Sequence, residues 1–210
     1  MAANGMGGWS GLCPTQELVD AYEMANGSTP IIGYNADGTP IINGASGYSE
    51  TGFAATAGKH YPAGVYNMYV GREPRFYASI NFNGQQWRGR QLEFWQGGKD
   101  GINVSKVDYC CTGYLLRKTA DEGVDVINGK GGMKEASILF RVGSLYLDYA
   151  EALNEVALAG GTIDNKEVLN SLIQLRKRAG IEPGNENYYG LPAPQNYDAA
   201  EMREIIRNER

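Results

Sequence analysis

Three tryptophans and 14 tyrosines are the side chains of this sequence with the clearest capacity for recognition chemistry. An indole or phenol ring has a flat apolar face and a polar edge, which suits it to stacking on the C–H face of a sugar ring. Trp9 lies in the glycine-rich stretch GMGGWSG, where no regular element would bury it and where glycines let a ligand approach the backbone closely. We therefore predict Trp9 as a carbohydrate contact. The alternative is that its ring folds back over the segment that begins near Pro14.

Two further tryptophans follow the Asn83-Gly84 dipeptide among side chains that carry amide and guanidinium groups, namely Gln85, Gln86, Arg88, Arg90 and Gln91. Such groups hydrogen-bond sugar hydroxyls while a ring stacks on the sugar face. Trp87 and Trp95 are therefore candidate carbohydrate-binding residues, with packing in a core or at a sheet edge as the alternative. Four tyrosines in loop segments have the same two interpretations: Tyr34, Tyr48, Tyr61 and Tyr66. Of these, Tyr48 and Tyr66 complete the predicted carbohydrate-binding set.

Groups that could carry catalysis or hold a metal give no coherent pattern. His60 is the only histidine, which argues against a His-based triad and a His-rich metal site, and we expect it to be a surface residue. Glu17, Asp20 and Glu23 repeat at a spacing of three, and carboxylates suit calcium, but a solvated helix face accounts for them. No catalytic residue and no metal ligand is predicted.

The cysteines and glycines are equally uninformative about cofactors. Cys13, Cys110 and Cys111 include an adjacent pair and no CxxC spacing, so neither a zinc site nor a disulfide framework is indicated. We expect them to act as small apolar fillers. The glycine-rich segments have neither a GKS/T sequence nor a strand-GxGxxG-helix context, so no nucleotide cofactor is predicted.

Composition excludes some classes of partner. A net charge of -5 gives no basic surface for a phosphate backbone, so nucleic acid is not an expected partner. No stretch approaches the roughly 20 apolar residues of a membrane-spanning helix. The first residues have neither the basic start nor the apolar middle of a secretory signal, so we identify no signal or lipidation site within the sequence.

The elements that must position these side chains change in type along the chain. Only six of the 29 glycines lie in residues 136–210, so residues 1–135 are predicted to be loop-rich and residues 136–210 helical. In the first part we expect a short helix entered at Pro14 or Thr15 and ended by Asn26-Gly27. RFYASINF, residues 75–82, alternates as a strand with one buried face, and a two-residue turn at Asn83-Gly84 predicts a β hairpin. Residues 113–118 are a further strand candidate.

The second part has helical periodicity. Apolar residues recur at three or four from Ser137 to about 158, namely Ile138, Val142, Leu145, Tyr149, Leu153 and Val156, and we expect them and Tyr146 to face a core. Asp164 and Glu167 have capping-box spacing, which predicts a second helix over residues 165–179, antiparallel to the first. Asp198 and Glu201 predict a third helix. Because this helix reaches Arg210 without a cap, we expect further sequence beyond it.

These segments together resemble the SusD/RagB-like family. PTQELVDAYEM, YVGREPRFYASINFNG, TGYLLRK, ILFRVGSLYLDYAEALNEV, LNSLIQLRKRAGI and MREIIRNER occur in the order of the family and cover about residues 12–210. The resemblance implies a mostly α-helical fold, with an irregular loop-rich part, short β hairpins and tetratricopeptide-like antiparallel helix pairs in the C-terminal part. It implies one SusD-like domain that is incomplete at both ends, because family members are about twice this length.

The same resemblance implies a function without catalysis. Family members are lipid-anchored at the surface of the outer membrane, bind oligosaccharide and deliver it to a SusC-type TonB-dependent transporter. Two other hypotheses stay open. The antiparallel helices suit a helical-repeat module for protein–protein contact. A glycoside hydrolase would need two facing carboxylates, for which Glu93, Asp100 and Asp108 are the candidates, although any sequence with 24 acidic residues supplies such pairs.

Overall fold

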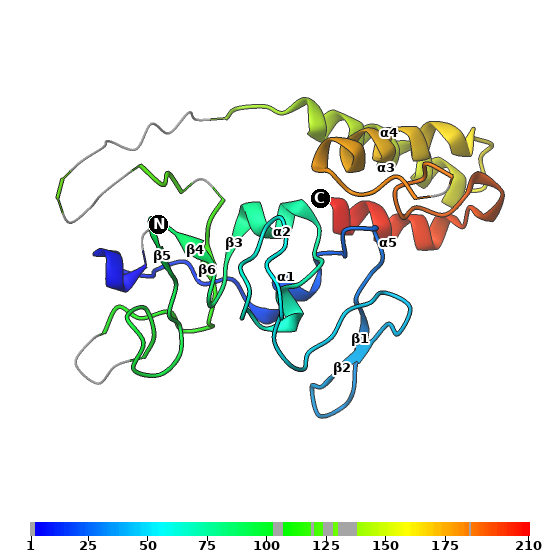
Figure 1. Ribbon diagram of the computed structural model, residues 1–210. Coiled ribbons are helices and arrows are strands. Elements are labelled where there is room, and N and C mark those ends of the chain that lie inside the picture. Colours follow the sequence, from blue (N-terminus) through cyan, green and yellow to red (C-terminus); the bar gives the residue numbers. More distant parts are fainter. Residues whose placement is uncertain (1–2, 103–106, 119, 124–127, 130–137, 185) are drawn as a thin grey trace. The chain divides into compact units, whose positions relative to one another are not determined.

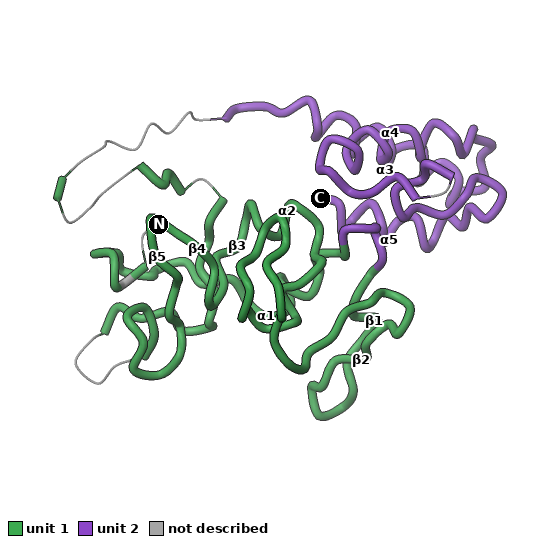
Figure 2. Tube along the Cα trace, in the orientation of Figure 1, with its two compact units in different colours: residues 1–24, 29–136 green, residues 25–28, 137–210 purple. Residues whose placement is uncertain are grey.

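A computed structural model describes residues 3–102, 107–118, 120–123, 128–129, 138–184 and 186–210 of the chain. The chain divides into unit 1, residues 1–24 and 29–136, and unit 2, residues 25–28 and 137–210 (Figure 2). Short antiparallel strand pairs occur in unit 1 and long helices in unit 2 (Figure 1). The prediction of a mostly helical fold with an irregular part and short strand pairs is confirmed.

Unit 1 is built from short elements. Its helices are η1 (Asn4–Met6), α1 (Gln16–Asp20), η2 (Asn67–Tyr69) and α2 (Pro74–Ser79). Its strands pair as β1 (Ile31–Tyr34) with β2 (Pro40–Ile42), β3 (Ile80–Asn81) with β6 (Leu115–Leu116), and β4 (Gln86–Trp87) with β5 (Arg90–Gln91). The side chain of Thr15 accepts a hydrogen bond from Leu18 N and so caps α1, as predicted. Helix α1 ends at Asp20, six residues before the predicted Asn26-Gly27 stop.

The predicted strand over residues 75–82 is wrong, because most of this segment forms helix α2. Pro74 occupies the first turn, where its fixed φ suits a helix and its missing N–H costs nothing. Phe76 and Ile80 are fully buried, a spacing of four that fits one face of a helix. Ala78 is exposed, which breaks the expected alternation. Only Ile80 and Asn81 are extended, and they pair with Leu116 and Leu115 in the further predicted strand.

A β hairpin is present, but five residues further along the chain than predicted. Its strands β4 and β5 pair Gln86 with Gln91 and Trp87 with Arg90. The turn is Arg88-Gly89, whose φ angles of 49° and 83° are both positive, as a two-residue hairpin turn of type I′ requires. Asn83-Gly84 forms a separate turn, in which Gln85 N donates to Phe82 O at 3.2 Å. That turn sends the chain from β3 into the hairpin.

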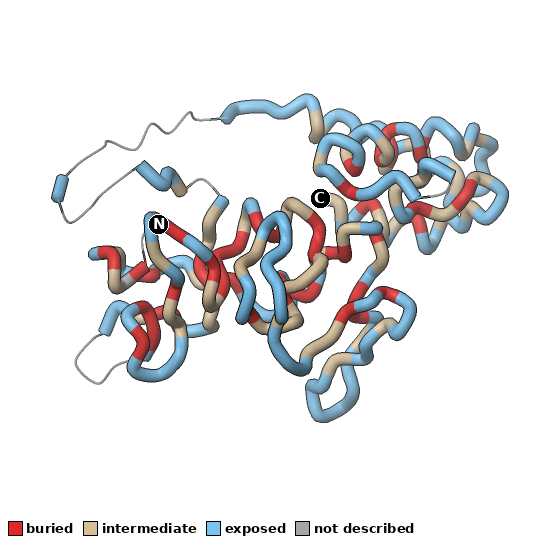
Figure 3. The backbone as a smooth tube through the Cα atoms, viewed as in Figure 1, coloured by how far each residue is buried: buried red, intermediate tan, exposed pale blue. Residues whose placement is uncertain are grey.

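Unit 1 has a core of packed rings. Tyr69, Phe76, Tyr77 and Phe82 are buried, and the rings of Tyr69 and Phe82 have centroids 4.4 Å apart. The buried stretch through α2 and β3 is red in Figure 3. Offset and edge-to-face ring pairs of this kind add to the stabilisation from apolar burial. This core fixes α2, and therefore the position of Tyr77.

A second cluster of unit 1 contains two of the cysteines. Cys110 is buried with Trp87, Leu92 and Leu115, and half-buried Cys13 packs against them. The Sγ atoms of Cys13 and Cys110 lie 3.8 Å apart. Cys111 is exposed, so the expectation that all three cysteines are apolar fillers is wrong for Cys111.

Unit 2 contains helices α3 (Val142–Leu158), α4 (Asn165–Ala179) and α5 (Ala199–Glu209), with η3 (Pro194–Asn196) before α5. Asp164 and Asp198 cap α4 and α5, and Gly180 ends α4 in the left-handed conformation, at φ 86°. The predicted bounds of α4 are confirmed. The described part of the first predicted helix begins at Val142, and Ser137 lies outside the described residues.

The helices of unit 2 share one core. Buried side chains from all three helices meet there, together with Leu191 from the segment before η3: Leu147, Ala150, Val168, Leu169, Leu172, Met202 and Ile206. Arg176 of α4 and Glu209 of α5 form a buried ion pair at 2.7 Å, and Arg176 also donates to Tyr189 O at 2.9 Å. Residues 25–28 belong to this unit, because Glu182 N donates to Ala25 O at 2.8 Å.

The face of α3 that packs is not the predicted one. Leu147, Ala150 and Asn154 are the buried residues of this helix. The predicted stripe is largely exposed, at 65% for Val142, 51% for Leu145 and 50% for Tyr149, and the segment leading into it is pale blue in Figure 3. Tyr146, also expected to pack, is 40% exposed. Helix α3 therefore has two apolar faces, and the core uses the narrower one.

Candidate functional site

A cavity of about 390 Å³ in unit 1 brings together aromatic rings and hydrogen-bond donors from four separate segments. It is lined by Gly58, Lys59, His60, Tyr61, Pro62, Tyr77, Gln85, Gln86 and Arg117. Its volume lies within the range of about 300 to 1,000 Å³ that is usual for small-molecule sites. We call it the Tyr61 pocket.

The aromatic wall of the pocket is built on Tyr77. The ring of His60 stacks on the ring of Tyr77 with centroids 5.1 Å apart and planes 21° apart, and Tyr61 stacks at 6.1 Å and 27°. Tyr77 is itself fixed, because its hydroxyl donates to Tyr69 O at 2.5 Å and accepts from Arg72 N at 3.1 Å. The two hydrogen bonds therefore hold the Tyr77 ring in one position, against which the other rings of the wall stack.

The loop that carries His60 and Tyr61 depends on Gly58. Gly58 N donates to Tyr61 O at 2.9 Å and closes a tight turn. A Cβ at residue 58 would lie 2.4 Å from Tyr61 Cζ, so the absence of a side chain lets the Tyr61 ring fold over its own loop. Pro62 follows Tyr61 in the sequence and restricts the backbone φ angle at that point of the loop.

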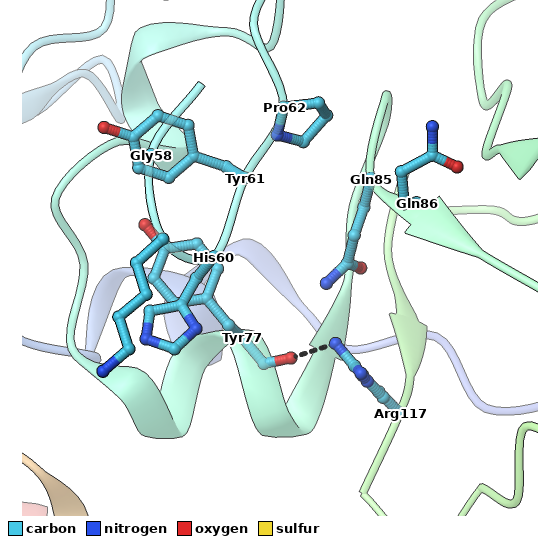
Figure 4. A pocket seen from close by; sticks show the side chains of 9 residues that line it. Gly58, His60, Tyr61, Pro62, Tyr77, Gln85, Gln86 and Arg117 are labelled. Carbon is cyan, nitrogen blue, oxygen red and sulfur yellow. Dashed lines mark hydrogen bonds between the residues drawn. The ribbon is translucent and has the colours of Figure 1, made fainter. Parts of the chain in front are cut away.

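The polar wall lies opposite, on Gln85, Gln86 and Arg117 (Figure 4). Gln85 is 3% exposed, and its Oε1 accepts a hydrogen bond from Phe82 N at 3.3 Å. Its Nε2 has no hydrogen-bond partner among the described residues. Figure 4 shows this amide extending toward the space between His60 and Arg117. A buried donor without a partner is costly, so a ligand acceptor there would stabilise it.

Arg117 is held in place by its neighbours. Its Nη1 donates to the carbonyl oxygen of Tyr77 at 2.7 Å, the dashed line in Figure 4. Its Nη2 donates to Glu122 at 2.8 Å, and its guanidinium lies 4.9 Å from the centroid of the Trp87 ring. A restrained guanidinium loses little conformational freedom when it binds a ligand.

The electrostatics of the Tyr61 pocket are positive. Lys59 and Arg117 line it, and no Asp or Glu is among its described lining residues. Burial, Lys59 and Arg117 together hold the pKa of His60 below its usual value, because each disfavours the imidazolium form. At neutral pH the His60 ring is therefore uncharged.

A second, smaller cavity of about 260 Å³ also lies in unit 1, lined by Gln16, Asp20, Tyr34, Gly38, Pro40, Glu50, Tyr66 and Met68. Tyr34 donates to Asp20 Oδ2 at 2.6 Å, and this hydrogen bond, with burial, raises the pKa of Tyr34 to about 12. Gln16 Nε2 donates to the other Asp20 oxygen at 2.7 Å. The polar groups of this cavity are thus largely hydrogen-bonded to one another, so it is a weaker candidate for ligand binding than the Tyr61 pocket.

The five predicted carbohydrate-binding residues do not line the Tyr61 pocket. Trp9 and Trp95 are 82% and 52% exposed, and half-buried Tyr66 lines the second cavity. Trp87 is buried at 2% exposure beneath Arg117, and Tyr48 is buried against Arg72. The rings of Trp87 and Tyr48 are therefore covered by protein in this structure.

Part of the pocket that does form could be predicted from the sequence. Tyr61 was among the loop tyrosines, and Gln85 and Gln86 were among the expected donors. His60 is exposed as expected, but it also lines the pocket, which its type alone did not indicate. Tyr77 and Arg117 had no such signal, since one was assigned to a strand and the other lies 40 residues further along the chain.

Two of the three carboxylates considered for hydrolysis, Asp100 and Glu93, have structural partners, and Asp108 is exposed. Asp100 is fully buried, and both its oxygens accept from Arg90 at 2.7 Å. It also accepts from Gly5 N and Glu93 N, at 3.1 and 3.0 Å. Glu93 accepts from Lys99 N at 3.1 Å. Among the residues described, no cluster of three or more His, Cys, Asp or Glu could hold a metal ion, and no helix is long and apolar enough to cross a membrane.

Comparisons with known proteins place these features in context. The model of the SusD family matches residues 2–210. A solved structure of a SusD-like carbohydrate binding protein from Bacteroides fragilis is 21% identical, with a TM-score of 0.63. The similarity covers 99% of this chain and 34% of that protein, so this chain spans about one third of its length. No curated protein sequence matches the chain.

Proposed function

Because the chain belongs to the SusD family, we propose that it binds oligosaccharide without altering it chemically, and that the Tyr61 pocket is part of its binding site. The family membership supports glycan binding as the general activity. The observation that carries the proposal to this pocket is the buried Gln85 amide, whose Nε2 has no partner among the residues that the structure describes and which faces a wall of aromatic rings.

The chemistry of the pocket suits a sugar. The exposed part of Tyr61 offers an apolar face for the C–H side of a pyranose ring, and Gln85, Gln86 and Arg117 offer donors for its hydroxyls. Trp9, Trp95 and Tyr66 remain proposed contacts for further sugar units, because each has exposed ring surface. Trp87 and Tyr48 would need their covering side chains to move before they could stack on a ligand.

The proposal includes the setting of the family. The whole protein would act at the surface of the outer membrane as a lipid-anchored protein and pass oligosaccharide to a SusC-type TonB-dependent transporter. Family membership is the support for this part. Co-purification of the full-length protein with a transporter encoded beside it would test the partnership, and no complex under mild detergent extraction would contradict it.

Binding is tested by isothermal titration of the chain against plant, host and microbial oligosaccharides. Tyr61→Ala should weaken binding about tenfold, because loss of a stacking ring removes roughly 1 to 1.5 kcal/mol. Tyr146→Ala is the matched control, since Tyr146 is an exposed tyrosine of unit 2. Trp9→Ala and Trp95→Ala extend the series. Unchanged affinity in Tyr61→Ala, with an unchanged melting temperature, would remove the pocket from the proposal.

Hydrolysis of the bound oligosaccharide is the alternative to binding without reaction, and it needs its own assay. Asp100 is saturated with four hydrogen bonds, two of them from Arg90, and has no free lone pair aimed at a ligand in this arrangement. A reducing-end release assay on each bound oligosaccharide should therefore show no cleavage. Cleavage that Glu93→Gln or Asp108→Asn abolishes would overturn the binding-protein proposal.

A further inference from the structure

We infer that the Tyr61 pocket selects an oligosaccharide that carries an anionic group, either a carboxylate or a sulfate. This inference rests on the proposed function and specifies the class of glycan. Its basis is the inventory of polar groups that the pocket offers, which is dominated by donors and by positive charge.

The unsatisfied group of the pocket is a donor. Gln85 Oε1 is occupied by Phe82 N, so only the Nε2 of Gln85 is available to a ligand. Arg117 has no acceptor atom, and Lys59 has none either. A neutral sugar hydroxyl both donates and accepts, whereas a carboxylate or sulfate only accepts. A carboxylate or sulfate therefore matches these donors more completely than a hydroxyl does.

The charge of the pocket points the same way. The whole sequence has a net charge of -5, yet Lys59 and Arg117 line this cavity with no carboxylate among its described lining residues. Arg117 pairs with Glu122, whose side chain is 55% exposed and contributes a single oxygen at 2.8 Å. An anionic ligand group can replace Glu122 at that nitrogen, because an exposed ion pair is weak.

Arg117 is also prepared for this role. Its contacts with Tyr77 O and the Trp87 ring do not involve Glu122, so the guanidinium keeps its place if Glu122 leaves. Charge-assisted hydrogen bonds to a fixed guanidinium are about twice as strong as neutral ones. The Tyr61 and His60 rings then hold the sugar that carries the anionic group.

The test compares matched ligands on the same protein. Trigalacturonic acid and its neutral methyl ester have the same sugar backbone, and sulfated lactose and neutral lactose make a second pair. We expect at least tenfold tighter binding of one charged member than of its neutral counterpart, with an advantage that shrinks between 50 and 500 mM NaCl. The pair that shows the difference identifies the carboxylate or the sulfate as the recognised group.

Two variants connect the preference to this pocket. Gln85→Glu keeps the acceptor for Phe82 N but replaces the free donor with a negative oxygen, and Lys59→Glu reverses an exposed charge. Each should reduce affinity for the charged ligand about tenfold or more. Lys118→Glu is the control, because Lys118 is exposed and does not line the pocket. Its affinity should change less than about twofold.

The outcomes separate this inference from the proposed function. If the parent chain binds neutral oligosaccharides as well as charged ones, and Lys59→Glu and Lys118→Glu behave alike, the anionic selectivity is overturned and glycan binding stands. If neither charged nor neutral oligosaccharides bind, the proposed function fails and this inference fails with it.

An independent observation concerns the cysteines: we propose that Cys13 and Cys110 are a disulfide-forming pair. Their Sγ atoms lie 3.8 Å apart, against about 2.05 Å in a disulfide, so the bond closes after a movement of less than 2 Å. The sequence spacing gave no indication of this pair, because 97 residues separate them. Cys111, although adjacent to Cys110, is exposed and stays outside the pair.

The oxidation is balanced with oxidised glutathione as the oxidant. The thiolate of half-buried Cys13 attacks one glutathione sulfur and forms a mixed disulfide, releasing one glutathione thiolate. Cys110 then loses its proton to solvent and attacks Cys13 Sγ, releasing the second glutathione. Burial raises the pKa of Cys110 to about 12, so this second step should be the slow one and should accelerate as the pH rises.

Peptide mapping of the full chain tests this pair. After incubation with oxidised glutathione and alkylation without reduction, we expect a linked peptide containing Cys13 and Cys110, with Cys111 alkylated. Cys111→Ser should keep the link, whereas Cys13→Ser and Cys110→Ser should abolish it. A link between Cys111 and Cys13, or a Cys13–glutathione adduct that persists at pH 9, would overturn the assignment.

Discussion

His60 shares the Tyr61 pocket with Lys59 and Arg117, and its protonation should control how strongly an anionic ligand binds. Its pKa is held below the usual value of about 6.5, so the ring is neutral at pH 7 and becomes positive as the pH falls through that lowered pKa. Below that point the pocket gains a third positive charge. The sequence predicts a surface histidine, and the structure adds that its ring stacks on that of Tyr77.

We therefore predict that affinity for the anionic oligosaccharide rises between pH 7.5 and pH 5, in a range where the ligand carboxylate stays ionised. His60→Phe keeps an aromatic ring against Tyr77, so it should bind at pH 7.5 nearly as the parent does and should lose the rise. The same pKa shift makes the neutral ring the form favoured by folding. Its stabilising contribution is thus complete above pH 6.5 and is lost as the pH falls through the folded-state pKa. Titrations at four pH values, each with a melting curve, separate the two effects.

The loop of residues 58–62 is the element on which the aromatic wall depends. A methyl group at residue 58 would collide with the end of the Tyr61 ring, which is the flexible part of that side chain. Gly58→Ala should therefore leave the fold nearly as stable, because the ring can swing away. It should also weaken glycan binding several-fold, since the displaced ring no longer stacks on the sugar.

Gly44→Ala is the matched control for this loop. A Cβ at residue 44 meets nothing within 4 Å, and the φ of Gly44 is not in the left-handed region. Its melting temperature should stay equal or rise slightly, because alanine restricts the unfolded chain. Calorimetric binding and melting curves of both variants decide the matter: equal affinities would show that the Tyr61 ring is not a contact.

At the scale of elements, the sequence predicted helix ends correctly where a recognisable capping residue is present. Asp164, Gly180 and Asp198 marked the ends of α4 and the start of α5, because each satisfies backbone groups within its own turn. Helix α2 was missed because Phe76 and Ile80 fit an alternating pattern as well as a helical one. The exposure of Ala78 distinguishes the two patterns, and exposure is decided by tertiary packing.

The candidate site was less predictable than the helices. Tyr61, Gln85 and Arg117 were all readable as polar or aromatic loop residues, but their convergence depends on the packing of α2 and on the β3–β6 pairing. The sequence makes Trp87 a candidate because amide and guanidinium groups surround it, but its large apolar ring fills a core under Arg117. Residue type predicts the capacity to bind a sugar, and burial decides whether the ring is available.

At the scale of the whole molecule, the exposed apolar side chains of residues 139–149, just before α3 and in its first turns, should govern association in solution. Leu139, Val142 and Leu145 are each at least half exposed, and Phe140 and Tyr149 add to the same stretch. Several large apolar side chains exposed within one short stretch favour association with another surface. This feature also gives the helical protein-contact hypothesis its specific support, since unit 2 presents these side chains.

We predict that the chain self-associates at micromolar concentrations and that Leu139→Lys with Leu145→Lys shifts it toward monomer. The double variant should keep its melting temperature, because both side chains are exposed. Sedimentation velocity across a concentration series measures the change. Leu158→Lys is a poorer position, since that residue is only 36% exposed. A monodisperse parent chain at 100 µM would contradict the prediction.

Residues 25–28 lie early in the sequence but belong to unit 2, so their contacts form only after much later residues have been synthesised. This short segment is completed only by residues near 182–190, where Ala25 O receives Glu182 N and Gly27 lies against Gly190 with no room for a Cβ. During synthesis it would leave the ribosome more than 150 residues before its partners do. Trypsin cleavage after exposed Arg141 should therefore yield two polypeptides that still elute together, because the N-terminal one carries a piece of unit 2.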